Sequence, residues 1–202
     1  MLEKANIAVL VSGGGTNLQA LIDAQNSGII QSGRIKLVIS NNAKAYALER
    51  ASKANIVTKT ILKKDFKNQD AFEDALINTL DSEDINLIVL AGFMSILSKK
   101  FTDHFKERII NVHPALIPSF CGEGFYGLKV HEAALAKGVK VSGATVHFVN
   151  EVPDGGKIIA QKAVEVKDGD TPEILQKRIM EQAEWIILPQ ATEAVCKKLI
   201  HP

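Results

Sequence analysis

The sequence contains little cysteine and no long hydrophobic run. Its two cysteines, Cys121 and Cys196, have neither metal-ligand spacing nor the numbers for a disulfide framework. No apolar stretch approaches the roughly 20 residues of a membrane span. The N-terminus has no charged leader or long apolar core, so we expect no signal peptide. These absences predict a cytoplasmic protein that neither crosses a membrane nor depends on disulfides.

An excess of charge of one sign is also absent. Lys and Arg number 24 and Asp and Glu 23, which gives a net charge of +1. The charges are mixed along the chain, which argues against a broad nucleic-acid surface but not against one local basic pocket. We therefore expect no nucleic-acid partner. Small-molecule substrates, no membrane partner and a monomer or weak homodimer are further expectations, and the charge balance does not bear on the oligomeric state.

The chain instead alternates short apolar runs with amphipathic stretches. Apolar strands are predicted at 7–12, 35–40, 56–62, 85–93 and 108–113, and helices at 17–28, 45–55, 69–82, 101–106 and 128–138. This alternation implies right-handed crossovers and a parallel sheet covered on both faces.

The pattern changes after Gly138. Two strands, at 142–149 and 157–166, are separated only by a hairpin-length loop and are predicted to extend the sheet in antiparallel fashion. A long helix from about Thr171, bent at Pro189, closes the domain. The predicted class is α/β: one domain, 1–202, with a Rossmann-like, mostly parallel sheet flanked by helices and a C-terminal antiparallel extension.

Three segments, "SGGGTN", "AGFM" and "NVHP", follow predicted parallel strands, and ligands bind at the carboxyl ends of such strands. The first is "SGGGTN", where glycines and a helix start favour the binding of a phosphate. Gly15, Thr16 and Asn17 are the candidate contacts, and a tight turn with a helix cap is the alternative. The loop lacks the third glycine of a dinucleotide fingerprint and the lysine of a P-loop, so we expect a single phosphate.

The segment "NVHP" places Asn111 and His113 on one side of a strand, because side chains alternate along it. An amide that can hold an oxyanion beside a titratable imidazole suits acyl transfer, although a strand-end amide and a packed histidine are the alternative. Asp154, in a D-G turn, is the candidate carboxylate to stabilise the imidazolium. His147 is expected to be packed and hydrogen-bonded, and His131 could reach the pocket. No metal-ligand pattern is visible.

Together these residues resemble the phosphoribosylglycinamide formyltransferase family over almost the whole chain. "VLVSGGGTNLQALID", "VLAGFMSILS", "NVHPALIPSF" and "TVHFVNEVPDGGKIIAQ" resemble its phosphate loop, folate-binding strand end, catalytic motif and downstream Asp-Gly motif. The resemblance implies a formyltransferase fold and formyl transfer from 10-formyltetrahydrofolate, without a metal, to the amine of N1-(5-phospho-D-ribosyl)glycinamide in purine biosynthesis.

The resemblance also implies roles for single residues. Asn111 and His113 would stabilise the tetrahedral intermediate, and Asp154 would orient His113 and help to move a proton. The implied contacts are Gly15, Thr16 and Asn17 for the phosphate, Glu184 or else Glu181 for the ribonucleotide, and Met94, Ser95, Ile96, Leu97 and Asn111 for the folate. Residues 1–110 would form the phosphate and ribonucleotide half, and 111–202 the catalytic and folate half.

The sequence departs from the family pattern in three places. Ser95 stands where many members have arginine, and Gln69 stands where a basic residue is common, with Lys67 as a substitute. The loop Cys121–Gly127 is longer than usual, and Cys121 is expected to be a loop residue because formyl transfer needs no thiol nucleophile.

Three alternatives remain at this point. Formyltetrahydrofolate hydrolase shares the Asn, His and Asp residues but usually carries an N-terminal regulatory domain. Methionyl-tRNA formyltransferase shares the core but would have an RNA-binding C-terminal domain and more positive charge. A non-catalytic module binding a phosphorylated metabolite is the third, because fold alone does not imply function.

Overall fold

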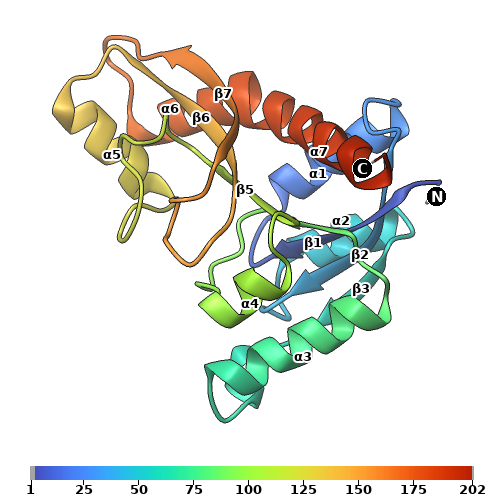
Figure 1. Cartoon of the computed structure of the whole chain (residues 1–202). Coiled ribbons are helices and arrows are strands. Elements are labelled where there is room, and N and C mark those ends of the chain that lie inside the picture. Colours follow the sequence, from blue (N-terminus) through green and yellow to red (C-terminus); the bar gives the residue numbers. More distant parts are fainter. Residues whose placement is uncertain (1–2, 202) are drawn as a thin grey trace.

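Seven strands form one sheet in the computed structural model, which describes residues 3–201 (Figure 1). The strands are β1 (Ala5–Val11), β2 (Gly33–Ser40), β3 (Val57–Thr60), β4 (Leu87–Leu90), β5 (Ile109–His113), β6 (Val141–Phe148) and β7 (Ile158–Glu165). The α-helices are α1 (Thr16–Asn26), α2 (Tyr46–Lys53), α3 (Gln69–Ser82), α4 (Lys99–His104), α5 (Leu128–Lys137), α6 (Pro172–Ile179) and α7 (Trp185–Ile200), with a short 3₁₀ turn η1 (Lys63–Asp65) and a π-helical turn η2 (Met180–Glu184).

The strand order is β3-β2-β1-β4-β5-β6-β7. Strands β1 to β5 are mutually parallel, whereas β6 pairs with β5, and β7 with β6, in antiparallel register. The predicted fold class, with its antiparallel extension after the fifth strand, is confirmed.

The parallel strands are buried on both faces, as their continuous apolar sequence predicted. Along β1, Ile7 and Val9 belong to a core cluster with residues of α1 and α7, while Ala8 and Leu10 belong to a second cluster with residues of α3. Figure 1 shows α3 and α4 on one side of the sheet and α1, α2 and α7 on the other. Fully burying an aliphatic side chain such as Ile7 or Leu10 stabilises the fold by about 1.5–3 kcal/mol. The stable strands in turn fix the positions of the loops at their ends.

The helix after Thr171 differs from its prediction. The irregularity lies at η2, whereas Pro189 lies inside α7 and is buried there. A π turn takes one more residue than an α turn, so the wider turn before Pro189 changes the direction of the side chains that follow. The break in the regular α-helix falls at the turn that contains Glu184, and a bend at Pro189 stays a prediction.

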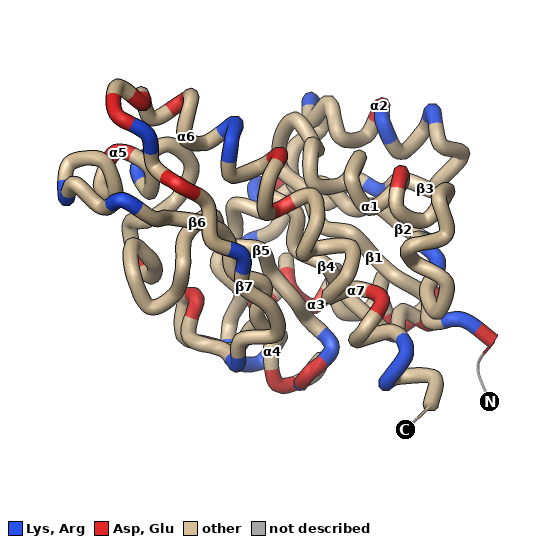
Figure 2. Tube along the Cα trace, turned by 90° about the horizontal axis from the view of Figure 1, so that it is seen from above, with Lys and Arg blue, Asp and Glu red and all other residues tan. Residues whose placement is uncertain are grey.

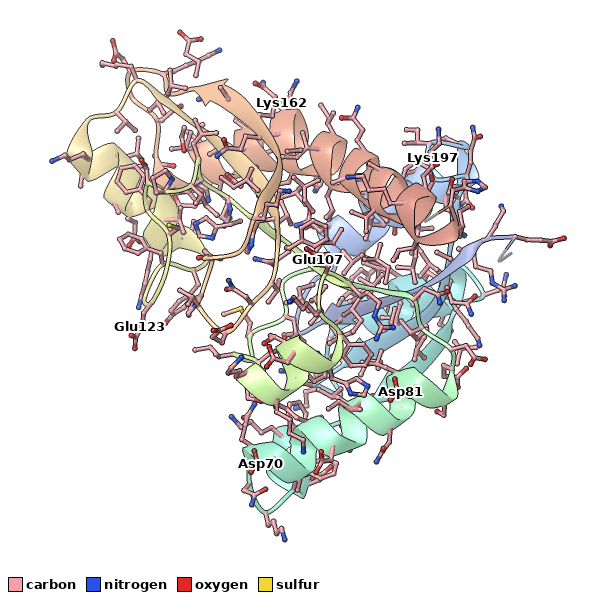
Figure 3. All side chains as sticks on the ribbon, in the orientation of Figure 1. Asp70, Asp81, Glu107, Glu123, Lys162 and Lys197 are labelled. Carbon is pink, nitrogen blue, oxygen red and sulfur yellow. The ribbon has the colours of Figure 1, made fainter. Side chains whose placement is uncertain are left out.

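Acidic and basic residues both occur along the length of the trace (Figure 2). The acidic and basic residues labelled in Figure 3, among them Glu123 and Lys197, are exposed. Within residues 3–201, no helix combines the length and the apolar character that a membrane span requires.

Candidate active site

Hydrogen bonds join the carboxyl ends of β1, β2 and β4. The Met94 amide donates to Ser12 Oγ at 2.8 Å, and Asn41 Nδ2 donates to Ser95 Oγ at 2.8 Å. The segment after β4 is therefore held against the two strands beside it, on the edge of the sheet where the sequence predicted the ligands.

The glycine loop between β1 and α1 is attached to α2. The Ala47 amide donates to Gly13 O at 3.1 Å, and Arg50 Nε donates to Gly14 O at 2.9 Å. Gly15 has φ +72°, and a Cβ there would lie 2.6 Å from Ala47 Cβ. The loop thus needs glycine at position 15 for both its dihedral angle and its close approach to α2.

The N-terminus of α1 is left open to a ligand. Its N-cap is Gly15, no side chain caps it, and its first turn contains no acidic residue. By contrast, Asn68, Ser98 and Thr171 cap α3, α4 and α6 with their side chains. Uncapped amides and the positive end of the helix dipole suit an anion such as a phosphate.

Glu184 faces this loop from η2. Asn17 Nδ2 donates to Glu184 Oε2 at 2.7 Å, and the Glu184 residue is 6% exposed. Burial raises the pKa of the Glu184 carboxyl to about 7, and the Asn17 bond offsets only part of that rise. Glu181, the other acid considered, is exposed and lies 3.9 Å from Lys177. Glu184 is therefore the acid that the fold brings to the glycine loop.

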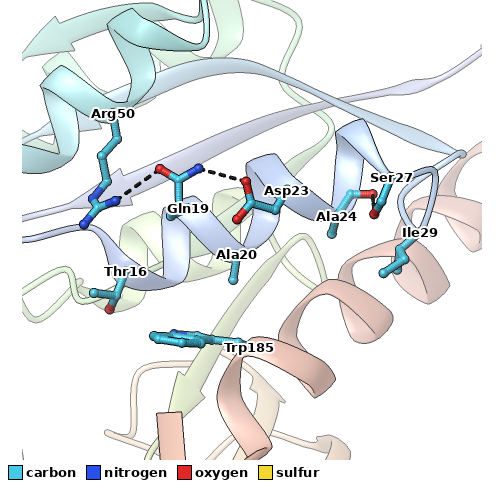
Figure 4. Close-up of a pocket in the computed structure, with 9 residues that line it drawn as sticks. All are labelled: Thr16, Gln19, Ala20, Asp23, Ala24, Ser27, Ile29, Arg50 and Trp185. Carbon is cyan, nitrogen blue, oxygen red and sulfur yellow. Dashed lines mark hydrogen bonds between the residues drawn. The ribbon is translucent and has the colours of Figure 1, made fainter. Parts of the chain in front are cut away.

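A cavity of about 400 Å³ lies along the outer face of α1 (Figure 4). Thr16 lines it at one end, and Trp185 from α7 lies across from Ala20. Arg50 Nη1 donates to Gln19 Oε1 at 3.2 Å, and Gln19 Nε2 donates to Asp23 at 2.9 Å. The bond from Arg50 joins α2 to α1, and the second bond lies within α1. Except for Thr16, no predicted site residue lines this cavity.

The candidate catalytic residues lie together at the end of β5. Asp154 lies between two imidazoles: its Oδ2 is 3.4 Å from His113 Nδ1, and its Oδ1 is 3.4 Å from His147 Nε2. Asn111 Nδ2 lies 3.3 Å from His147 Nε2. The Gly122 amide donates to Asp154 Oδ2 at 2.9 Å, which links the Cys121–Gly127 loop to the carboxylate.

Each imidazole is oriented through its other nitrogen by a backbone carbonyl. His113 Nε2 lies 2.8 Å from Phe120 O, and His147 Nδ1 lies 2.7 Å from Phe148 O. Since a carbonyl only accepts, these nitrogens carry the proton in the neutral rings. A second proton on His113 is therefore gained at Nδ1, directly facing Asp154.

Burial and neighbouring charge act in opposite directions on these groups. Burial lowers the pKa of His113, and the Asp154 carboxylate only partly restores it. Burial would raise the pKa of Asp154, but the neighbouring His147, the bond from the Gly122 amide and the positive charge of a protonated His113 lower it below its usual range. The arrangement thus holds an ionised carboxylate beside an imidazole poised to gain or lose a proton.

His147 was not predicted as a site residue, and the structure places it in the cluster. It is 1% exposed and hydrogen-bonded, as expected, yet it also faces Asn111 and Asp154. Position 147 pairs with Asn111 across the β5–β6 ladder, and Thr145 pairs with His113. Residues that pair across two strands have their side chains on the same face of the sheet. The register of β5 and β6, if known, would therefore have placed His147 beside Asn111.

His131 on α5 lies beside this cluster but outside its hydrogen bonds. The residue is 0% exposed, and neither ring nitrogen has a partner within the described residues. Burial, followed by the neighbouring His113, lowers the pKa of His131 to about 4. It is therefore a neutral packed histidine across the ordinary pH range.

The predicted folate residues line hollows next to the cluster. Ser95, Ile96 and Leu97 join Asn111, His147 and the loop up to Asp154 around a space of about 140 Å³. Ile96 is 71% exposed, and Met94, which lines the neighbouring hollow, is 61% exposed, so two apolar side chains are uncovered on this side of the site. Within residues 3–201, no cluster of three or more His, Cys, Asp or Glu side chains could hold a metal ion.

Comparison with known proteins agrees with this geometry. The formyl transferase family profile matches residues 5–192. The phosphoribosylglycinamide formyltransferase of Haemophilus influenzae is 45% identical over 91% of this chain and 83% of its own length. The human trifunctional purine biosynthetic protein adenosine-3 is 45% identical over 98% of this chain, which spans only 19% of that protein. The chain belongs to the formyl transferase family.

Solved structures give the same result for the fold. Glycinamide ribonucleotide transformylase 1 from Symbiobacterium toebii superposes with a TM-score of 0.91 at 40% identity, over 98% of this chain and 90% of its own. Phosphoribosylglycinamide formyltransferase from Coxiella burnetii gives 0.87 at 42% identity, over 98% and 89%. The resemblance read from the motifs and the prediction of a formyl-transferring enzyme are confirmed, and folate as cosubstrate follows from the family.

Proposed function

We propose that this chain transfers the formyl group of 10-formyltetrahydrofolate to the amine of N1-(5-phospho-D-ribosyl)glycinamide. The products are the N-formyl ribonucleotide and tetrahydrofolate, a step of de novo purine (IMP) biosynthesis. The observation that carries the proposal is the contact of Asp154 with His113, beside Asn111 and a hollow lined by the predicted folate residues.

Acyl transfer to an amine passes through a tetrahedral intermediate with a negatively charged oxygen. The Asn111 amide supplies a donor for that oxygen, and a protonated His113 supplies positive charge beside it. Asp154 stabilises the protonated ring at Nδ1 and holds its orientation. Through this pair the proton lost by the attacking amine reaches the leaving nitrogen, so Asn111, His113 and Asp154 are the proposed catalytic residues.

The ribonucleotide binds at the other part of the site. The open N-terminus of α1 receives the phosphate through Gly15, Thr16 and Asn17. Glu184 accepts from ribonucleotide hydroxyls, which its burial next to Asn17 supports. Met94, Ser95, Ile96, Leu97 and Asn111 line the folate side. Residues 1–110 thus supply the phosphate contacts and four of the folate residues, and 111–202 supply the catalytic residues, Glu184 and the rest of the folate side.

The direct test follows folate deformylation by absorbance, with 10-formyltetrahydrofolate in the presence and absence of the ribonucleotide. We expect release that depends on the ribonucleotide and yields its formyl derivative. Release without an acceptor would instead indicate the hydrolase, and no release from folded protein would favour another acceptor or a binding module.

His113→Ala tests the mechanism. It should fold normally and lose turnover by about 10³-fold, the size seen for single oxyanion or proton-transfer groups. The matched control is His104→Ala, because His104 forms an exposed pair with Asp81 at 2.9 Å, outside the cluster. Unchanged turnover in the His113 variant would remove the proposed mechanism.

The cytoplasmic location, the monomeric or weakly dimeric state and the lack of nucleic-acid or membrane partners remain predictions. Sedimentation over a range of protein concentrations tests the oligomeric state. Binding assays with tRNA and with anionic vesicles test for nucleic-acid and membrane partners.

A further inference from the structure

Two successive carbonyl groups of the glycine loop are bonded to α2. The Ala47 amide donates to Gly13 O at 3.1 Å, and Arg50 Nε donates to Gly14 O at 2.9 Å. In a trans peptide the C=O and the N–H point in opposite directions. The two bonds therefore turn the amides of the next residues, Gly14 and Gly15, away from α2, so this helix decides which way two amides of the loop face.

The amides at this end of α1 are open to an acceptor. Among residues 3–201, the amides of Gly14, Gly15, Thr16 and Asn17 donate no hydrogen bond. The first amides of a helix have no partner within the helix, and here no side chain caps them. Successive N–H groups at the positive end of a helix dipole suit an anion, and the proposed function places the substrate phosphate there. The direction of the Gly15 amide therefore bears on phosphate binding.

Arg50 differs from the other donor to the loop because it is charged. Its guanidinium forms no ion pair within residues 3–201. It bonds to Gly14 O and to Gln19 Oε1 (Figure 4), and it lies 5.0 Å from the centre of the Tyr46 ring. A charged donor on the Gly14 carbonyl polarises that peptide group, which makes the Gly15 N–H at its other end a stronger donor.

We propose that Arg50 is a positioning residue for the substrate phosphate. It acts through the Gly14 carbonyl: its bond fixes the direction of the Gly15 amide and strengthens that amide as a donor to the phosphate. The inference rests on the proposed function and requires no contact between Arg50 and the phosphate itself. Arg50 therefore sets the affinity for a substrate that carries a phosphate. It leaves the proton transfer at Asp154 and His113 unchanged, because that step takes place at the other part of the site.

The experiment replaces Arg50 with methionine, which keeps an aliphatic stem and removes the guanidinium. Arg50→Met should raise KM for the ribonucleotide by about 10-fold, the low end of what a hydrogen bond from a charged group contributes. The glycinamide ribonucleoside, which lacks the phosphate, should keep its wild-type KM, as should the folate, and kcat should stay within about twofold. A general defect of the fold would instead change all four quantities, and that result would overturn the proposal.

The matched control is Lys53→Met on the same helix. Lys53 Nζ also lies over the Tyr46 ring, 5.6 Å from its centre, but it does not bond to the glycine loop. A second control, Gln19→Met, removes the other partner of Arg50 and keeps the bond to Gly14. Both controls should keep the wild-type KM for the ribonucleotide. A rise in Lys53→Met equal to that in Arg50→Met would mean that positive charge alone acts, and no rise in Arg50→Met would exclude any role; either result would overturn the proposal.

Titration of ¹⁵N-labelled protein with ribose 5-phosphate, followed by NMR, tests the same role without turnover. If no formyl transfer occurred, the proposed function would fail while this titration still decided the role of Arg50. The Gly15 amide resonance should move on binding, and Arg50→Met should bind the phosphate ester about 10-fold more weakly than wild type. Ribose without the phosphate is the control ligand and should leave that resonance in place. A Gly15 amide that ignores ribose 5-phosphate, or equal affinity in both proteins, would overturn the proposal.

Discussion

Two buried carboxyl groups in the candidate site have opposite pKa shifts. The Asp154 side chain is 13% exposed and the Glu184 residue 6%, so both lie mostly out of water. Two imidazoles and a backbone amide surround Asp154 and lower its pKa, whereas Glu184 has one amide donor and a pKa raised to about 7. Partners, rather than burial alone, decide which carboxyl is charged, and in the proposed mechanism this division separates proton transfer from hydroxyl binding.

The largest expected effect comes from removing the charge at Asp154. Asp154→Asn keeps a side chain that tolerates the φ of +55° found there. Without the carboxylate, His113 loses the group that stabilises its proton. We expect kcat to fall by about 10³-fold, or about 4 kcal/mol, at nearly unchanged melting temperature. Steady-state kinetics test this, and a kcat within tenfold of wild type would contradict it.

Removing the ionisable carboxyl at Glu184 should instead make the folded chain more stable. Its pKa rises from 4.5 in the unfolded chain to about 7 in the folded one. As pH rises from 4.5 to 7, the unfolded chain releases a proton that the folded chain keeps, so folding loses about 3 kcal/mol in total. Glu184→Gln removes this loss, and should be more stable above pH 7 yet bind the ribonucleotide at least tenfold more weakly.

Urea denaturation at pH 5 and pH 8, together with KM for the ribonucleotide, tests this prediction. The stabilisation should be present at pH 8 and nearly vanish at pH 5. Glu181→Gln, on the exposed side of the same turn, is the control and should change neither quantity. A Glu184 variant that is less stable at pH 8 would show that the carboxyl is charged and satisfied in the folded chain.

These two positions also show what the sequence could and could not predict. The order of strands placed the glycine loop, "AGFM" and "NVHP" on one edge, because parallel strands share their carboxyl ends. The sequence did not decide whether Glu181 or Glu184 faces the glycine loop. A helical period of 3.6 residues would separate the two positions, but the π turn interrupts that period. His147 was missed because antiparallel register is not readable from one strand.

A smaller effect at neutral pH is expected at Gly15, which sets the position of Asn17, the one donor to Glu184. Gly15→Ala forces a left-handed φ on alanine and a Cβ against Ala47, and should cost about 2 kcal/mol of folding free energy. Gly13→Ala is the control, since no atom lies within 4 Å of its added Cβ. Equal stability of the two variants would mean that the loop adjusts freely.

The smallest effect at neutral pH, and a clear one in acid, is expected at His131, which is as buried as His113 but has no partner for either ring nitrogen among residues 3–201. Its pKa falls from 6.5 in the unfolded chain to about 4 in the folded one. Stability is therefore unaffected above pH 6.5 and falls by about 3 kcal/mol as pH drops to 4, because only the unfolded chain gains the proton. His131→Leu should match wild type at pH 7 and exceed it by about 2 kcal/mol at pH 4.5 in urea denaturation. The exposed control His104→Leu should not exceed wild type in this way at pH 4.5. If wild type and His131→Leu lost stability in parallel as the pH fell, the buried ring would have found a partner for its proton.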